Sequence, residues 1–239
     1  MANQTSLGSI IVTGASSGIG RATAACLLTE GYRVIGVSRS IEVRTFEHDN
    51  FQALSCDLAN FTQTEQTFKQ LLKTKPDIVG AVFCAGAGYF GALEQLKFSK
   101  IQALINLNLS SPILLSSLIA PYLKAKKSGC MVFIGSEAAL SGTKNGTAYC
   151  ATKFGLRGFT QALAAECRQA GVAVSLINPG MVDTPFFDEL NFMPGEDASN
   201  RIAPETIATQ VAHIFSSDIN TVVEEINLSP RNKVVQFKT

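Results

Sequence analysis

The chain of 239 residues is 46% hydrophobic and 16% charged, which is enough for one large α/β domain with a sizeable core. Its formal net charge of +1 gives no electrostatic case for binding nucleic acid or an anionic membrane. The six cysteines form no Cys-x-x-Cys pair and only two histidines accompany them, so we expect reduced thiols and no metal site. Neither a signal peptide nor an apolar run long enough to span a membrane is evident, and we expect a cytoplasmic protein.

The first predicted element is a buried parallel strand over 9–13, which a glycine-rich turn joins to a helix. The turn reads GASSGIG over 14–20. Gly14 permits a tight turn, Gly18 lets the backbone approach a phosphate, and Gly20 allows close packing of the helix. The N-terminus of that helix offers N–H groups and a positive dipole end to a pyrophosphate. A purely structural turn is the alternative, because the spacing G-x-x-x-G-x-G differs from G-x-G-x-x-G.

The second predicted strand, 33–38, ends where a dinucleotide-binding fold recognises the ribose of its cofactor. An acidic residue at this place binds the ribose hydroxyls of NAD, but this chain has Ser38 followed by Arg39. A guanidinium without the acid suits the additional 2′-phosphate of NADP, so the pair predicts NADP(H) over NAD(H). The alternative is a solvated arginine after a strand.

Strands and helices alternate along the rest of the chain. The expected strands are 51–56, 78–84, 130–135, 172–178 and 222–228. The expected helices are 61–72, 96–107, 110–126, 149–170 and 204–215, with an irregular connection over 41–50. The pattern predicts a single domain over 1–239, a Rossmann-type doubly wound sheet of about seven mainly parallel strands with helices on both faces. The residues that directly follow strands should meet at its carboxyl edge: Gly14, Arg39, Asp57, Gly86, Ser136 and Pro179.

Residues 183–203 show little periodicity but contain several aromatic side chains. A long, partly apolar loop after a strand is often a lid over a substrate, and a plain surface excursion is the alternative. We expect this segment to give the substrate pocket an apolar side through Phe186, Phe187 and Leu190.

The segment 136–153 carries the most specific chemistry. Tyr149 lies thirteen residues after Ser136 and four before Lys153, so a helix beginning near Tyr149 would put it and Lys153 on one face. An isolated tyrosine has a pKa of about 10, and a neighbouring cation would lower that pKa. With the Ser136 hydroxyl holding a substrate oxygen, these groups suit proton transfer in carbonyl–alcohol chemistry. The alternative is a boundary tyrosine followed by a solvated lysine.

Over 7–228 these motifs resemble the classical short-chain dehydrogenase/reductase family. The Ser–Tyr–Lys spacing of 136, 149 and 153 matches that family. Its cofactor turn resembles TGASSGIG (13–20), and the segment with its adenine-binding aspartate resembles CDL (56–58). Its Asn-Asn-Ala-Gly stretch resembles CAG (84–86). Its active-site asparagine segment resembles NLSS (108–111), and its Pro-Gly segment resembles NPGMVDT (178–184).

The resemblance implies a role for each catalytic residue. Tyr149 would give a proton to the substrate oxygen as hydride arrives, and Ser136 would hydrogen-bond that oxygen. Lys153 would bind the nicotinamide ribose and lower the pKa of Tyr149. Asn108, rather than Asn106, would support a water that relays protons to Lys153. The implied cofactor-binding residues are Gly14, Ser16, Ser17, Gly18, Ile19, Gly20, Ser38, Arg39, Asp57, Leu58, Cys84, Ala85, Gly86, Tyr149, Lys153, Pro179, Gly180, Val182 and Thr184.

The resemblance also implies a small-molecule carbonyl or alcohol substrate and a homodimer or homotetramer formed through helices 110–126 and 149–170. Two departures matter: Phe83 and Cys84 stand where the family often has two asparagines, and the C-terminus lacks the VDGG segment of acyl-carrier reductases. We therefore expect an NADPH-dependent carbonyl reductase. The alternatives are a 3-oxoacyl-thioester reductase of the same family and a non-catalytic NADP-binding regulatory protein.

Overall fold

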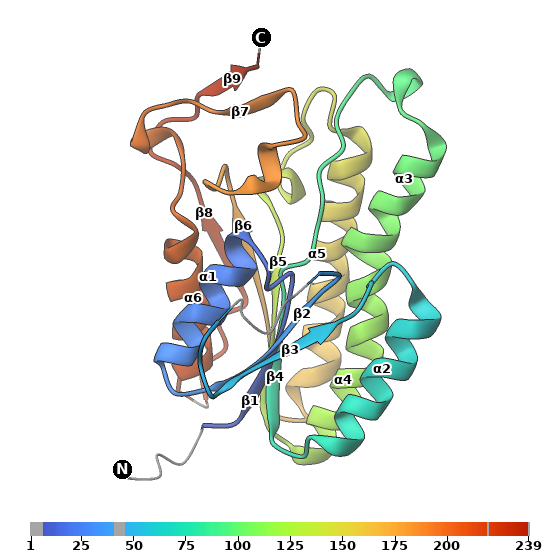
Figure 1. Cartoon of the computed structure of the whole chain (residues 1–239), viewed down its shortest axis with the longest axis vertical. Helices are drawn as coiled ribbons and strands as arrows, with labels where there is room; N and C mark the ends of the chain where they lie inside the picture. The colour runs from blue at the N-terminus through green and yellow to red at the C-terminus, as the bar shows by residue number, and fades with distance from the viewer. Residues whose placement is uncertain (1–6, 41–45, 219, 239) are drawn as a thin grey trace.

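A computed structural model describes residues 7–40, 46–218 and 220–238. At its centre is a seven-stranded sheet in the order β3-β2-β1-β4-β5-β6-β8 (Figure 1). All neighbouring strands are parallel, and the strand order reverses between β1 and β4. The strands are β1 (Ser9–Thr13), β2 (Arg33–Ser38), β3 (Phe51–Ser55), β4 (Ile78–Phe83), β5 (Gly129–Ile134), β6 (Val172–Pro179) and β8 (Glu225–Leu228). The predicted doubly wound Rossmann-type sheet is confirmed.

Helices cover both faces of the sheet (Figure 1). On one face lie α1 (Gly18–Thr29) and α6 (Pro204–Ser216), and on the other lie α2 (Phe61–Thr74), α4 (Ser111–Lys126) and α5 (Thr147–Arg168). The central strands are buried from both sides, and every residue of β1 is buried. This explains why these strands are continuous apolar, β-branched runs rather than alternating ones. The two faces form two apolar cores, one containing Phe68 and Phe133 and the other containing Ile10 and Leu27.

The helices predicted over 96–107 and 110–126 are one continuous helix, so that division was wrong. α3 (Phe98–Ile105) passes through a π turn at Asn106–Ser110 directly into α4. Pro112, at the start of α4, lacks an N–H and crowds the carbonyl four residues earlier, which is at Asn108. The wider π turn absorbs this defect, so the proline does not end the helix.

The continuous helix Phe98–Lys126 is long and apolar enough to cross a membrane, by length and composition alone. The sequence analysis did not predict a helix of this kind, because it found no apolar run of sufficient length. In the fold the α4 half of this continuous helix lies against the sheet beside α2 and α5, and its α3 half packs against α5 (Figure 1). Within its most apolar window, 44% of the residues are buried. The helix therefore serves here as a packing layer.

Other boundaries differ from the expectation by small amounts. The last predicted strand, 222–228, is shorter because β8 begins at Glu225. Of the predicted connection 41–50, residues 41–45 lie outside the described residues, and 46–50 form no helix or strand. All six cysteines are free and four are buried. Within the described ranges no group of three His, Cys, Asp or Glu side chains could hold a metal ion.

The segment 183–203, which we call the lid after the role predicted for it, contains more regular structure than predicted. Two 3₁₀ turns, Pro185–Phe187 and Ala198–Asn200, flank a short strand, β7 (Phe192–Pro194). β7 pairs in antiparallel register with β9 (Val235–Phe237), a C-terminal strand that the sequence analysis did not anticipate. Three-residue strands are too short for a recognisable alternation of polar and apolar residues. The ribbon lies beyond the carboxyl ends of the main strands, close to the C-terminus (Figure 1).

Candidate active site

The structure brings Ser136, Tyr149 and Lys153 together at the carboxyl edge of the sheet. Tyr149 lies in the first turn of α5 and Lys153 one turn later, and they are only 7% and 6% exposed. Ser136 directly follows β5 and Gly135, and its hydroxyl accepts a hydrogen bond from the Ala138 N–H at 3.1 Å. Its side chain is also close enough to Tyr149 to act on the pKa of that tyrosine. The predicted spacing therefore corresponds to a real cluster.

Burial dominates the electrostatics of this cluster. Burial raises the pKa of Tyr149 to about 12, although the Ser136 side chain acts in the opposite direction. Burial also lowers the pKa of Lys153 from 10.5 to about 8. The Lys153 ammonium lies 5.8 Å from the centroid of the Tyr149 ring, and in the protein alone its attraction does not outweigh burial. At neutral pH Tyr149 is therefore a neutral phenol that can give a proton, and Lys153 is mainly a cation.

Asn108 lies in the π turn and is 2% exposed. Its side-chain amide pairs with the backbone of Ala87, accepting from the N–H and donating to the carbonyl, both at 2.9 Å. It also donates to the Thr152 hydroxyl at 3.3 Å. The amide therefore fixes the loop after β4 against α5, whereas Asn106 is only half-buried.

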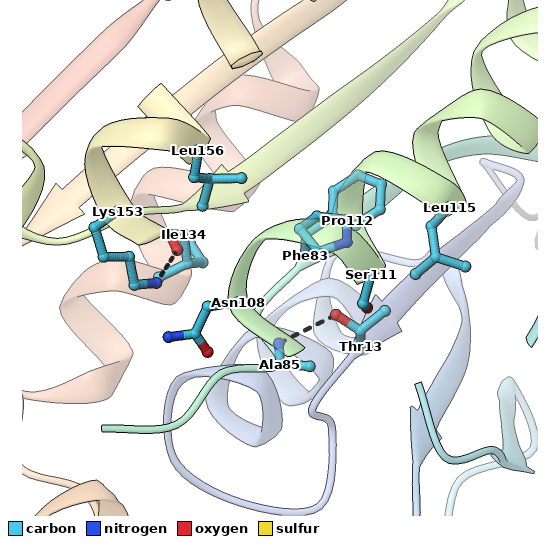
Figure 2. Close-up of a pocket in the computed structure, with 10 residues that line it drawn as sticks. All are labelled: Thr13, Phe83, Ala85, Asn108, Ser111, Pro112, Leu115, Ile134, Lys153 and Leu156. Carbon is cyan, nitrogen blue, oxygen red and sulfur yellow. Dashed lines mark hydrogen bonds between the residues drawn. The ribbon is translucent and has the colours of Figure 1, made fainter. Parts of the chain in front are cut away.

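A cavity of about 10 Å³ lies behind these residues, about the room that one water molecule needs (Figure 2). Lys153 Nζ donates to the Ile134 carbonyl at 3.0 Å, and the ends of the Lys153 and Asn108 side chains point toward each other (Figure 2). The cavity is lined by Thr13, Phe83, Ala85, Asn108, Ser111, Pro112, Leu115, Ile134, Lys153 and Leu156. The geometry can accommodate one water between the lysine and the amide.

The turn between β1 and α1 forms a cradle for an anion. Gly14 and Gly18 have φ of 70° and 50°, a region that favours glycine. A Cβ on Gly20 would overlap the carbonyl of Gly14, so close packing requires a glycine there. Among the described side chains none caps the N-terminus of α1 at Ser17, and its first turn holds no acid. The free N–H groups and the helix dipole therefore suit the pyrophosphate of a dinucleotide.

Three loops that follow β1, β4 and β6 converge on this cradle. The Thr13 hydroxyl accepts from the N–H groups of Cys84 and Ala85, both at 3.1 Å, which fixes the loop after β4 to the first strand. A Cβ on Gly18 would lie 3.1 Å from Thr184, and one on Gly86 would lie 3.3 Å from Asn108. A side chain at either glycine would crowd a neighbouring loop, and this run of small residues beside the free helix N-terminus fits a nicotinamide dinucleotide.

The end of β2 forms the next part of the cofactor region. The Ser38 hydroxyl donates to the hydroxyl of Ser16 at 3.0 Å, and Arg39 is exposed beside them. Asp57 follows β3, and its carboxylate accepts from the Ala59 N–H at 3.1 Å, while Leu58 is buried. Of the remaining predicted cofactor residues, Ile19 lies at the start of α1, Pro179 ends β6, and Gly180 and Val182 follow that strand.

An aromatic cluster surrounds Tyr149, and only part of it was predicted. Phe186 from the lid lies 6.0 Å from the Tyr149 ring, between centroids, and Phe187 lies 5.2 Å from Phe186. Phe90, which the sequence analysis missed, lies 5.0 Å from Tyr149 and 5.0 Å from Phe192. Its signal was two aromatics, Tyr89 and Phe90, inside a loop of small residues. Predicted Leu190 is buried, but no described contact places it against Tyr149.

Asn178 at the end of β6 was also missed. It is 1% exposed, and its Oδ1 accepts from the Ser136 N–H at 3.3 Å. Its Nδ2 donates to the side chains of Glu225 and Asn227 on β8, both at 2.9 Å. A Cβ on Gly135 would overlap this amide. The amide therefore holds the backbone of Ser136 in place, and a polar residue ending an apolar strand was the available signal.

Comparisons with known proteins identify the family of this chain. The family model described as short chain dehydrogenase matches residues 9–194. "Short chain dehydrogenase adrF" of Penicillium roqueforti is 34% identical over 73% of this chain and 70% of its own length. The "3-oxoacyl-[acyl-carrier-protein] reductase" of Buchnera aphidicola is 32% identical over 75% of each chain. A crystal structure of a metagenomic short-chain oxidoreductase in complex with NADP superimposes with a TM-score of 0.82, at 31% identity, covering 94% of this chain and 97% of that one.

Proposed function

This chain belongs to the short-chain dehydrogenase/reductase family of oxidoreductases, and from that premise we propose that it is an NADP(H)-dependent reductase of apolar carbonyl compounds. The observation that carries the proposal is the buried cluster of Ser136, Tyr149 and Lys153 beside an anion cradle at the carboxyl edge of the sheet. The metagenomic relative that was solved with NADP supports a nicotinamide cofactor.

Proton transfer would be carried by three side chains. When bound, the nicotinamide cofactor supplies the hydride that adds to the carbonyl carbon, or accepts it in the reverse direction. The Ser136 hydroxyl holds the carbonyl oxygen, and Tyr149, whose raised pKa keeps it protonated, gives its proton to that oxygen as negative charge develops. The products are an alcohol and a phenolate, and the Lys153 cation stabilises the phenolate.

Reprotonation of Tyr149 would use the cavity behind the site. The cavity has room for about one water, and Asn108 and Lys153 both line it. Lys153 would give a proton to the phenolate, and a water in the cavity would pass a proton from solvent to the neutral lysine amine, which restores the ammonium. Asn108 would hold that water, while its two bonds to Ala87 keep the amide in one orientation.

The cofactor would lie along the loops after β1, β4 and β6. The N–H groups of the turn 14–20 would bind the pyrophosphate, Asp57 and Leu58 the adenine, and Thr184 the carboxamide. Serine hydroxyls and the Arg39 guanidinium at the end of β2 would bind a 2′-phosphate, which supports NADP(H) over NAD(H).

The substrate would be apolar on at least one side. Phe90 and Phe186 approach Tyr149 from two segments, so a carbonyl compound that reaches the Tyr149 hydroxyl would contact aromatic rings. A 3-oxoacyl thioester is the second candidate, since the Buchnera relative bears that name. We also propose a cytoplasmic homo-oligomer formed through α4 and α5, where Ile113 and Phe154 are 39% and 44% exposed.

The test is NADPH oxidation measured with aryl ketones, diketones, quinones and 3-oxoacyl thioesters, with NADH in parallel. Turnover of aryl ketones that requires NADPH and Tyr149 would support the proposal. A preference for thioesters would support the second candidate. Confirmed NADPH binding without turnover of any carbonyl would instead favour a regulatory protein.

A further inference from the structure

The C-terminal residues 230–238, which we call the strap, run across the lid. The β9 part of the strap pairs with β7 of the lid. The Gly195 N–H donates to the Val234 carbonyl at 3.0 Å, and the Lys238 N–H donates to the Asn191 carbonyl at 2.9 Å. The lid is therefore held by backbone bonds on both sides of its short strand.

Lys238 adds a second attachment at the aromatic turn of the lid. Its Nζ donates to the carbonyls of Phe187 and Asp188 at 2.6 and 2.9 Å. These carbonyls close the 3₁₀ turn Pro185–Phe187, whose negative dipole end attracts a cation. The ammonium therefore fixes the turn that carries Phe186 and Phe187.

The strap also contacts the catalytic loop on the other side of the site. Lys233 Nζ lies 2.7 Å from the carboxylate of Glu137, the residue after Ser136. Earlier in the strap, the Asn232 side chain donates to the Ser199 hydroxyl of the lid at 2.8 Å. One segment thus joins the lid to the loop that positions Ser136.

A continuous set of ring contacts leads from the strap to the reacting group. The strap pairs with β7, and the first residue of β7 is Phe192. The Phe192 ring lies 5.0 Å from that of Phe90, which lies 5.0 Å from Tyr149. Displacement of β7 would therefore remove one support of the aromatic wall at Tyr149.

We propose that the strap is a specificity-determining element, and that Lys238 is a positioning residue that holds the aromatic lid against the pocket. This proposal rests on the reductase function proposed above. With the lid held, the pocket selects apolar, ring-containing carbonyl compounds by contact with Phe90 and Phe186. Without it, the aromatic wall is disordered and the discrimination against small aliphatic ketones decreases.

The β9 part of the strap buries little side-chain surface. All three residues of β9 are exposed, and Phe237 is 70% exposed. An isolated two-stranded ribbon is marginally stable in water. The two lysine attachments should therefore decide whether the ribbon persists, which makes single substitutions informative.

The first test is Lys238→Met, together with a chain that ends after Lys233. For an aryl ketone we expect KM to rise about three- to tenfold in Lys238→Met, the effect of losing a charge-assisted hydrogen bond that is partly screened by solvent. We expect kcat and the NADPH dissociation constant to change little. The truncated chain should show a larger rise in KM and a smaller aryl-over-aliphatic preference. Lys238→Arg should retain most of the original KM.

The matched control is Lys126→Met. Lys126 Nζ also donates to two backbone carbonyls, those of Pro76 and Ile78 at 3.1 and 2.8 Å, but at the opposite end of the sheet. The Lys126→Met substitution removes the same charge and the same kind of contact, so the KM of this variant should equal that of the unchanged chain.

Hydrogen exchange gives a readout that needs no substrate. Amides at 191–195 should exchange faster in both strap variants and normally in Lys126→Met. Unchanged exchange and unchanged KM after truncation would overturn the proposed role of the strap. Failure of the reductase function has a different signature, since the unchanged chain would then turn over no carbonyl compound at all.

Discussion

Replacing Lys153 with methionine should abolish turnover without destabilising the fold near neutral pH. Methionine has a similar length and no charge, so it fills the same buried space. Lys153 is 6% exposed, and burial lowers its pKa from 10.5 to about 8. The buried charge therefore lowers the free energy of unfolding, and removing that charge should raise it.

The magnitude follows from the pKa. A tenfold change in proton affinity corresponds to about 1.4 kcal/mol, so a pKa lowered from 10.5 to about 8 implies a penalty of about 3 kcal/mol for the buried cation. Lys153→Met also leaves the Ile134 carbonyl without its donor, which costs about 1–3 kcal/mol. The variant should therefore be as stable as the unchanged chain, or more stable by up to about 2 kcal/mol, at pH 7.

The sign of the pH dependence provides the sharper test. Below about pH 8 Lys153 is charged in both states and its penalty is fully present. Between about pH 8 and 10.5 the folded state has lost the proton and the unfolded state still binds it, so the stability of the unchanged chain rises with pH. Between pH 7 and pH 9.5 the difference in unfolding free energy should therefore shift by about 2 kcal/mol in favour of the unchanged chain.

Urea unfolding of both proteins at several pH values measures this difference. Lys69→Met is the control, because Lys69 is an exposed helix residue paired with Glu65 and its removal should give no comparable pH dependence. A difference between Lys153→Met and the unchanged chain that stays constant from pH 7 to 9.5 would refute the reasoning. So would a variant that is clearly less stable at pH 7.

Three further substitutions test other parts of the site. Tyr149→Phe should lower kcat by about 10²–10⁴-fold and leave the NADPH dissociation constant nearly unchanged, and full activity in this variant would rule out the proton-transfer role. Arg39→Asp should reverse or flatten the ratio of kcat/KM for NADPH over NADH, and an unaltered ratio would mean that another group reads the phosphate. Asn178→Ala removes the hydrogen bond to the Ser136 N–H, so it should lower the free energy of unfolding by about 2–4 kcal/mol and reduce kcat. Denaturation and kinetics that match the unchanged chain would contradict this positioning role.

The sequence allowed the sheet and the core of the site to be predicted for a physical reason. In a parallel sheet buried on both faces, each strand is an apolar run, and residues that follow the strands lie at one edge. Ser136, which follows β5, could therefore be expected at that edge, whereas Tyr149 was proposed from its spacing to Lys153 and Asn108 only from the family resemblance. Their electrostatics could not be predicted, because the raised pKa of Tyr149 depends on how deeply the lid and the helices bury it.

The features that were missed depend on contacts between distant segments. β7 and β9 each have three residues and form only because the chain end returns to the lid. Phe90 acquires its meaning from Tyr149, 59 positions away in the printed numbering and 5.0 Å away between ring centroids. The continuity of α3 and α4 depends on a local widening that a proline at 112 did not reveal. The periodicity of apolar residues predicts single helices and strands. These features depend on contacts between two elements, so periodicity could not predict them.

The π turn at Asn106–Ser110 departs from regular helix geometry, and the position of Asn108 in the site depends on that departure. A π turn contains one more residue per hydrogen-bonded ring than an α turn, so deleting one residue there would restore a regular α-helix. That deletion would rotate everything before it by about 100° relative to α4, because each residue of an α-helix advances about a quarter turn. When the deleted residue lies between Asn108 and α4, Asn108 would then no longer face Ala87. We expect a shorter, more regular helix to pack against the sheet but to disrupt the site. The π turn should therefore be unusually intolerant of a one-residue deletion.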